Sequence, residues 1–228
     1  MFRVLKSQWL APKVRRLEVE APRVAARHRP GHFVIVRAYE GGERVPLTIA
    51  DSDPRRGTIT LVIQAIGATT ERLCSLQAGD SLPDVVGPLG KATEIEHFGH
   101  VVLVGGGVGT AVIYPQAGAL KAKGNRVTAV IGGRAREYVI LEQELAAICD
   151  AVYPCTDDGS YGYRGFVTGK LTDVTVTPGA GKTASAVCGR GLHLHAETAG
   201  GGAGGTGVDR AGSETWRAQR GAFWQRPV

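Results

Sequence analysis

The sequence has few cysteines, and none of them stands in a metal-binding arrangement. Its 228 residues include four, which lie far apart and form no Cys-x-x-Cys pair: Cys74, Cys149, Cys155 and Cys188. This spacing argues against a structural zinc site and against a disulfide framework. A chain of this kind suits a reducing cytoplasm.

Long apolar runs are also missing. No stretch approaches the ~18 to 20 apolar residues of a membrane helix, and the N-terminal sequence MFRVLKSQWLAP has no apolar signal-peptide core. We therefore expect a soluble, unprocessed cytoplasmic protein with no membrane span.

Aromatic residues are scarce, at 6% of the chain, and the formal net charge of +6 comes from scattered lysines and arginines. A nucleic-acid groove usually gathers basic side chains and interleaves them with aromatic ones. The pattern instead predicts a solvated surface with at most a docking role, and no nucleic-acid partner.

The most informative segment that is present runs from His100 to Leu120. Four apolar residues, 101–104, are typical of a strand covered on both faces in a parallel sheet. Glycines at 105, 106, 107 and 109 permit a tight turn, and a helix over 110–123 would aim its free N–H groups at that turn, as in a pyrophosphate site. Thr110 stands where the third glycine of Gly-x-Gly-x-x-Gly would fall, so a turn that binds nothing stays an alternative.

The segment before residue 98 reads as short strands separated by turns. We predict strands over 2–10, 13–20, 32–38, 44–51, 58–66 and 81–85, a helix over 69–76 and a Gly-Pro turn at 86–90. Six strands with one helix before the last indicate a small antiparallel β-barrel domain, residues 1–98.

The segment after residue 98 alternates strands with helices, which predicts a Rossmann-like parallel α/β domain over residues 99–180. Strands are expected over 101–104, 126–131 and 151–155, a glycine turn at 132–133, and helices over 110–123 and 137–148. The loops 105–109, 132–136 and 156–160 would then share the ligand-binding edge of the sheet.

The last segment, residues 181–228, has low complexity. Residues 189–228 hold ten glycines and only four Val, Leu or Ile among forty positions. Such a segment buries too little apolar surface to offset an ordering entropy of ~1 to 2 kcal/mol per residue. We expect a disordered tail and an incomplete α/β domain.

Three segments of the first half carry groups that could converge on a flavin. Arg44 offers a cation for a pyrophosphate, and Thr48 offers a hydroxyl for a ring nitrogen. Gly67, Thr69 and Thr70 begin a helix and form a second anion site. Taken singly, each has a structural alternative, as a solvated charge or an ordinary helix cap.

Residues 1 to about 170 resemble the flavin- and pyridine-nucleotide-binding subunits of the ferredoxin-NADP reductase superfamily. The resemblance lies in PGHFVIVRAYEGGERVPLTIAD, DVVGPLGKATEIEHFGHVVLVGGGVGTAVIYPQAGALKAKGN and TDDGSYGYRGFVT. It extends to the alpha subunit of NADH-dependent ferredoxin:NADP oxidoreductase, sulfide dehydrogenase and the electron-transfer subunit of dihydroorotate dehydrogenase. It implies FAD on the barrel, NAD(P)H on the α/β half, and hydride transfer between them.

The residue pattern and the resemblance together predict the cofactor contacts. Thr48, which the resemblance places near flavin N5, is the one catalytic candidate. The FAD candidates are Arg44, Val45, Pro46, Leu47, Thr48, Val62, Ile63, Gln64, Gly67, Thr69, Thr70, Gly87 and Pro88. The NAD(P) candidates are Gly105, Gly106, Gly107, Val108, Gly109, Thr110, Gly132, Arg134, Asp157, Asp158, Gly159 and Ser160.

The sequence departs from the family pattern at two points. Val45 stands where many relatives carry an arginine. The family also implies a C-terminal [2Fe–2S] cluster, which needs four closely spaced thiolates, and the segment after Cys155 offers only Cys188. The tail resembles the product of a reading-frame change. Arg134 and Arg136 could neutralise an NADP 2′-phosphate, but the resemblance slightly favours NAD(H) over NADP(H).

These observations predict a flavoprotein oxidoreductase that passes a hydride between NAD(P)H and FAD. Electrons would go on to a larger catalytic or iron–sulfur flavoprotein subunit, or to a ferredoxin-type carrier. The alternative is a non-catalytic remnant, or an assembly module that holds FAD for a larger reductase complex. No metal ligand set is predicted, because His193 and His195 have no third partner.

Overall fold

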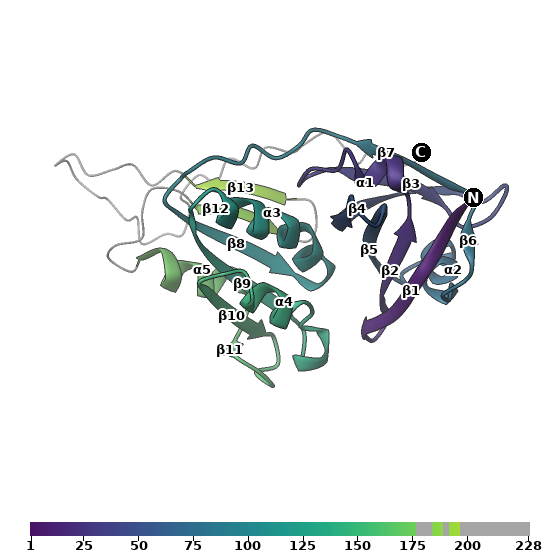
Figure 1. Ribbon diagram of the computed structural model, residues 1–228. Helices are drawn as coiled ribbons and strands as arrows, with labels where there is room; N and C mark the ends of the chain where they lie inside the picture. Colours follow the sequence, from purple (N-terminus) through teal and green to yellow (C-terminus); the bar gives the residue numbers. More distant parts are fainter. Residues whose placement is uncertain (177–183, 189–191, 197–228) are drawn as a thin grey trace, which may run out of the picture.

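The computed structural model describes residues 1–176, 184–188 and 192–196. The first half forms an antiparallel sheet in the order β6-β1-β2-β5-β4-β3-β7 (Figure 1). Its strands are β1 (Phe2–Ala11), β2 (Val14–Glu20), β3 (Phe33–Arg37), β4 (Arg44–Asp53), β5 (Thr58–Gln64), β6 (Ser81–Leu82) and β7 (Asp84–Leu89), and its helices are α1 (Pro22–Ala25) and α2 (Ala68–Ser75).

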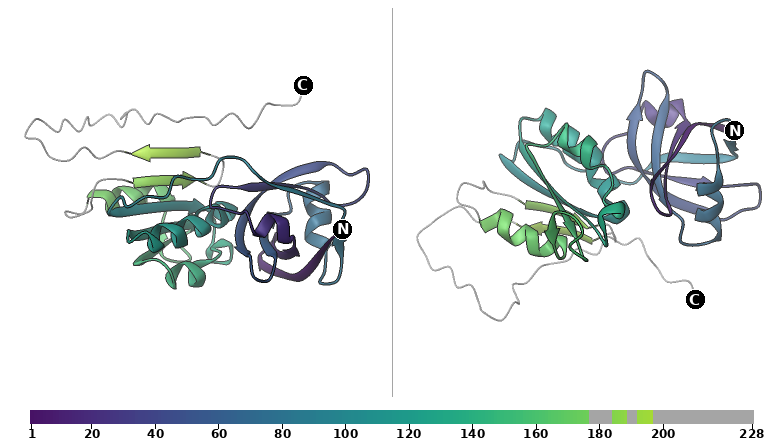
Figure 2. Two further views of the ribbon diagram at one scale, coloured as in Figure 1. Left: turned by 45° about the horizontal axis from the view of Figure 1, so that its top comes forward. Right: turned by 90° about the horizontal axis from the view of Figure 1, so that it is seen from below.

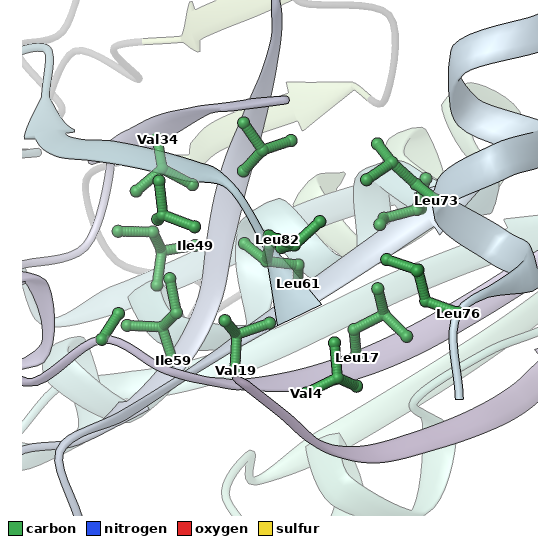
Figure 3. Close-up of a cluster of buried hydrophobic side chains, with 14 of the residues drawn as sticks. Val4, Leu17, Val19, Val34, Ile49, Ile59, Leu61, Leu73, Leu76 and Leu82 are labelled. Carbon is green, nitrogen blue, oxygen red and sulfur yellow. The ribbon is translucent and has the colours of Figure 1, made fainter. Parts of the chain in front are cut away.

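This sheet is a nearly closed barrel, as the alternating sequence pattern predicts. Apolar side chains at every second strand position point inward, and α2 adds Leu73 to the same core (Figure 3). Because the inner side of the sheet is buried, apolar residues recur at every second position, for example at Leu17 and Val19 on β2. At ~25 cal/mol per Å² of apolar surface, this interior is the main stabilising contribution of the half.

The prediction of six strands was wrong by one. The strand expected over 81–85 divides into β6, which pairs with β1, and β7, which pairs with β3. Only Pro83 separates the two, yet they lie at opposite ends of the sheet order. Proline has no N–H to donate to a ladder, so the chain can change partners there and bring the barrel almost to closure.

The Gly-Pro turn expected at 86–90 is instead part of β7. Gly87 and Pro88 form a bulge opposite β3, where the pairing shifts between Phe33 and Ile35. A β-carbon on Gly87 would lie 2.7 Å from Cγ1 of Val34, so the strands meet closely at this point. The glycine serves strand packing rather than a turn.

A histidine pair makes the barrel sensitive to acid. His28 Nδ1 lies 2.7 Å from the Ser52 hydroxyl, and His28 Nε2 is buried with no partner among the described residues. Burial, together with the neighbouring His32, lowers the pKa of His28 to about 4. The folded state therefore prefers the neutral ring, and stability present above pH ~6.5 is lost as the pH falls toward 4.

We expect the free energy of unfolding to drop by about 1–2 kcal/mol on this account between pH 7 and pH 4, allowing for solvent screening. Urea unfolding of the wild type and of His28→Gln at both pH values checks this, because the free energy of unfolding of the variant should fall less between pH 7 and pH 4. His97→Gln, at an exposed position, is the matched control. Equal losses in wild type and His28→Gln would contradict the assignment.

The second half holds a parallel sheet in the order β11-β10-β9-β8. Its elements are β8 (His100–Gly106), the 3-10 turn η1 (Gly107–Gly109), α3 (Thr110–Ala122), β9 (Arg126–Gly133), the 3-10 turn η2 (Arg136–Tyr138), α4 (Glu142–Ala146), β10 (Ala151–Thr156), β11 (Tyr163–Arg164) and α5 (Val167–Val176).

Both faces of this sheet are covered, as the uninterrupted apolar run 101–104 predicts. Val101 and Leu103 pack with α3 and α4, and Val102 and Val104 pack with α5 on the other face. The parallel pairing of β8, β9 and β10 confirms the predicted sheet. Among the described residues, no helix is long and apolar enough to cross a membrane.

Two local predictions in this half were wrong. The glycine turn expected at 132–133 is the end of β9, which pairs with β10 at both residues. The helix expected over 137–148 is reduced to η2 and α4. Leu141 adopts a left-handed φ of 58° and is buried with Ile140 against the barrel, so the helix cannot continue through this point.

Ten residues of the predicted tail lie among the described residues. Strands β12 (Ala184–Cys188) and β13 (Leu192–Ala196) pair with each other, and β12 lies beside β8 (Figure 1). The rest of the predicted tail, at 181–183, 189–191 and 197–228, lies outside the described residues.

The barrel and the α/β half are two neighbouring lobes joined by residues 90–99 (Figure 2). The buried Asn125 side chain holds the end of this connection, because its Oδ1 accepts hydrogen bonds from the N–H groups of Phe98 and Gly99. Thr93 N–H donates to the carbonyl of Pro30 on the barrel side. The connection is thus anchored to both lobes.

Candidate functional site

The glycine-rich loops of the α/β half meet at one edge of the sheet, as predicted. The strand pairing places Gly106 beside Gly132 and Gly133 beside Thr156. A β-carbon on Gly105 would lie 2.8 Å from Cα of Thr110, so this glycine is needed for the turn itself. A β-carbon on Gly106 would have no atom within 4 Å, so the space beyond Gly106 is open.

The N-terminus of α3 faces this open space. Gly107 has a φ of 54°, which favours glycine, and a β-carbon there would also meet no atom within 4 Å. Thr110 is fully buried and its hydroxyl donates to the carbonyl of Gly105, so it closes the turn rather than facing a ligand. The first N–H groups of a helix have no acceptor within it. The edge therefore has the features of an anion site.

The chain after β9 carries two arginines stacked on tyrosine rings. The guanidinium of Arg134 lies 3.9 Å from the ring centre of Tyr138 and donates to the Tyr138 hydroxyl. The guanidinium of Arg136 lies 4.9 Å from the ring centre of Tyr161. Stacking of this kind holds a cation in place without neutralising it. Both arginines thus present fixed positive charge beside the loop 157–160.

The loop 157–160 is held by hydrogen bonds to its neighbours. The N–H of Asp157 donates to Gly133, and the N–H of Asp158 donates to Arg134. The hydrogen bonds from Ser160 lower the pKa of the exposed Asp158 carboxyl. Gly159 has a φ of 76° at the tip. The loop therefore has a defined shape next to β9, with an ionised carboxylate on it.

On the barrel, β4 presents alternate residues to opposite faces. Val45 and Leu47 pack against the barrel core, which leaves Pro46 and Thr48 for the outer face. Thr48 pairs with Phe33, and its hydroxyl has no hydrogen-bond partner among the described residues. Phe33 was not among the residues predicted from the sequence, although its alternation with the buried Val34 could have placed it beside Thr48.

Helix α2 starts at Gly67, which has an extended φ of −164° and open space around its β-carbon position. The Thr70 hydroxyl accepts hydrogen bonds from the N–H groups of Ile66 and Gly67. The buried Thr69 donates its hydroxyl to the Glu43 carboxylate at 2.9 Å. The first turn of α2 is therefore a second candidate anion site, at which Glu43 occupies one donor.

The remaining FAD candidates differ in what they can offer. The half-buried Val62 packs beside Val108 where the two lobes meet, and Gln64 is exposed. Ile63 points into the barrel core with 1% exposure, so only its backbone is available to a ligand. Gly87 and Pro88 lie in β7, and neither belongs to the apolar cluster that joins the two lobes.

An apolar cluster that no sequence pattern predicted joins the two lobes. We call it the junction cluster, and its buried members are Ala11, Val14, Ala50, Ala111, Ile140 and Leu141. Tyr114 and Tyr138 pack on its margin. These residues come from β1, β2, β4, α3 and the segment before α4, so no local sequence signal marks them. The cluster sets the relative position of the outer face of β4 and the glycine-rich edge of the parallel sheet.

The three cysteines within residues 1–176 do not fit an iron–sulfur cluster. Cys74, Cys149 and Cys155 belong to three separate apolar clusters. Burial raises the pKa of each thiol, to about 11 for Cys149. A [2Fe–2S] cluster needs four converging thiolates. Within residues 1–176 the chain therefore offers no site for one.

No protein-family model matches the chain. It is 46% identical over 165 residues to the dihydroorotate dehydrogenase B (NAD(+)) electron transfer subunit homolog of Thermotoga maritima, which covers 72% of this chain and 58% of that protein. It is 32% identical over 192 residues to the corresponding electron transfer subunit of Geobacillus thermodenitrificans, covering 82% of this chain and 72% of that subunit.

Among solved structures, the chain is similar to one described under "Insights into flavin-based electron bifurcation via the NADH-dependent reduced ferredoxin-NADP oxidoreductase structure". The TM-score is 0.77 at 40% identity, covering 83% of this chain and 68% of the other. The reductase GcoB of an Amycolatopsis cytochrome P450 system, at 22% identity and a TM-score of 0.66, shares the fold. The chain spans 58 to 65% of several curated relatives.

The identity and coverage of these matches confirm the resemblance drawn from the three sequence segments, and the two-lobed arrangement of barrel and parallel sheet agrees with them. The chain belongs to the family of dihydroorotate dehydrogenase B electron transfer subunits, within the ferredoxin-NADP reductase-like flavoproteins.

Proposed function

We propose that this chain is the electron-transfer subunit of a flavin-dependent oxidoreductase, with FAD on the barrel. NAD(P)H would bind at the edge of the parallel sheet where the glycine-rich loops meet, which we call the nucleotide edge. The observation that carries the proposal is the open space before two helices, because no atom lies within 4 Å of the β-carbon positions of Gly67 before α2 and of Gly106 and Gly107 before α3. The start of a helix next to open space suits a pyrophosphate, so each helix could take one.

The barrel residues fit FAD in three respects. The first turn of α2 offers N–H donors for a pyrophosphate, with Thr69 and Thr70 beside them. Pro46, Thr48 and Phe33 offer an apolar outer surface with one free hydroxyl, which suits a flat ring. The exposed Arg44 lies on the same strand and supplies a cation near this surface. The Val45 side chain is uncharged and packs on the barrel core, so it cannot take the place of the arginine that many relatives carry there.

The α/β residues fit a reduced dinucleotide in the same way. Gly106, Gly107 and the start of α3 would hold its pyrophosphate, and the stacked arginines would line its adenosine side. Asp157 to Ser160 would cover its riboses. We propose NADH as the donor, by a small margin over NADPH, since Arg134 and Arg136 could also accept a 2′-phosphate.

FAD, when bound, would supply the redox chemistry of hydride and electron transfer. The protein contributes position and the exclusion of water. Thr48 would orient the ring through its free hydroxyl, and the buried residues of the junction cluster would exclude water from part of the contact between the lobes. No described side chain is assigned the role of acid or base.

We propose that electrons pass on to a larger catalytic or iron–sulfur flavoprotein subunit, or to a ferredoxin-type carrier. The names of the relatives support a partner, since they are electron transfer subunits of dihydroorotate dehydrogenase B.

Anaerobic visible absorption of the purified chain tests the proposal. Flavin bands that bleach on addition of NADH, or of NADPH, would support it and identify the donor. Flavin bands that persist with both would favour the alternative, a module that holds FAD without reducing it. A colourless chain that takes up no added FAD would overturn the proposal.

A further inference from the structure

An ion pair joins the two lobes at the rim of the junction cluster. Nη2 of Arg16 on β2 lies 2.5 Å from Oε1 of Glu144 on α4, and the side chains are 28% and 36% exposed. The Lys121–Asp150 pair is similar, at 2.6 Å with 40% and 35% exposure, but lies within the α/β half. The first pair therefore acts between the lobes, while the second does not.

The surroundings of the pair are partly enclosed. A cavity of about 220 Å³ is lined by residues of β1, β2, β4, β5, α3 and α4, among them both members of the pair. Lys6, Glu18 and Asp51 are the other charged residues of its lining. Nε of Arg16 is buried and has no partner among the described residues. Partial exclusion of water strengthens an ion pair relative to one on an open surface.

Glu144 ends a short segment that reaches from the barrel to the nucleotide edge. Arg134 and Tyr138 lie at its other end, and Ile140 and Leu141 between them are buried in the junction cluster. Glu142, in the same segment, accepts a hydrogen bond from the Tyr161 hydroxyl at 2.8 Å. Segment 134–144 is thus tied to the barrel at one end and to the nucleotide loops at the other.

We propose that Arg16 is a positioning residue. By holding Glu144, it fixes segment 134–144, and with it the nucleotide edge, at the distance from β4 that hydride transfer requires. The inference rests on the proposed function. Reacting atoms must come within about 3–3.5 Å, and a displacement near 1 Å costs roughly 100-fold in rate. A polar contact at the rim can therefore change the rate without touching either cofactor.

Stopped-flow reduction of the FAD-loaded chain by saturating NADH tests this. Arg16→Met keeps the apolar stem of the side chain and removes the charge. We expect its limiting reduction rate to fall at least tenfold, with little change in apparent NADH affinity, FAD content or flavin spectrum. The charge swap Arg16→Glu with Glu144→Arg should recover most of the rate. Lys121→Met should react like wild type.

A wild-type limiting rate in Arg16→Met would overturn the inference. Failure of the wild type itself to be reduced would instead count against the proposed function. A second measurement then tests the positioning directly. Without the pair, the lobes should separate more often, so protease should cleave the connection 90–99 several-fold faster in Arg16→Met than in wild type or Lys121→Met. Equal cleavage rates would overturn the inference.

Discussion

Replacing Gly106 by valine is expected to abolish reduction by NADH or NADPH while leaving FAD bound and the fold intact. Gly106 has an extended φ of −111°, and no atom lies within 4 Å of its β-carbon position. A valine there costs the fold little, because extended backbone suits a β-branched residue. Its methyl groups would fill the space before α3 that the dinucleotide pyrophosphate needs.

The size of this effect depends on the hydrogen bonds that the valine would prevent between the pyrophosphate and the backbone. A hydrogen bond to a charged group contributes about 1.5–3 kcal/mol, so preventing two of them should lower the second-order rate of flavin reduction at least about 100-fold. Stopped-flow absorbance measures this, with thermal unfolding as the check on stability. Gly118→Ala, within α3 and also in open space, is the control and should react normally.

Gly105→Ala gives the contrast one residue away. Its β-carbon would lie 2.8 Å from Cα of Thr110, so this variant should lose thermal stability as well as activity. A Gly106→Val chain that is reduced at the wild-type rate would show that the glycine loop does not hold the nucleotide.

Replacing Gly67 by valine should yield a folded chain purified without flavin. Gly67 precedes α2 with an extended φ of −164° and open space at its β-carbon position. The valine would occupy the approach to the first N–H groups of α2, where the FAD pyrophosphate is proposed to lie. The loss of glycine at this helix cap should cost the fold only about 1 kcal/mol.

We expect the dissociation constant for FAD to rise at least about 100-fold, again because two charge-assisted hydrogen bonds would be prevented. Titration of the flavin-free chain with FAD, followed by fluorescence quenching, measures it. Ser75→Ala changes an exposed residue at the other end of α2 and should leave FAD binding unchanged. Normal FAD content in Gly67→Val would place the flavin pyrophosphate elsewhere.

Predictions failed where distant residues decide the local structure. The stretch 137–148 has a helical pattern, but Ile140 and Leu141 are used to pack against the barrel, and the left-handed Leu141 interrupts the helix. The Gly-Pro pair at 87–88 is typical of a turn. It became a bulge because β3 lies close enough for Gly87 to be required beside Val34.

Local signals in the chain were enough to predict the strands with alternating or uninterrupted apolar residues, the glycine turn at 105–109, the start of α2, and the family. These features depend on neighbours within a few positions along the chain. The junction cluster and the Arg16–Glu144 pair emerged only from the folded arrangement. Arg16 and Glu144 are 128 positions apart, and the members of the cluster come from separate elements between Ala11 and Leu141. These contacts form only when the two lobes pack against each other, and a local sequence pattern carries no information on that packing.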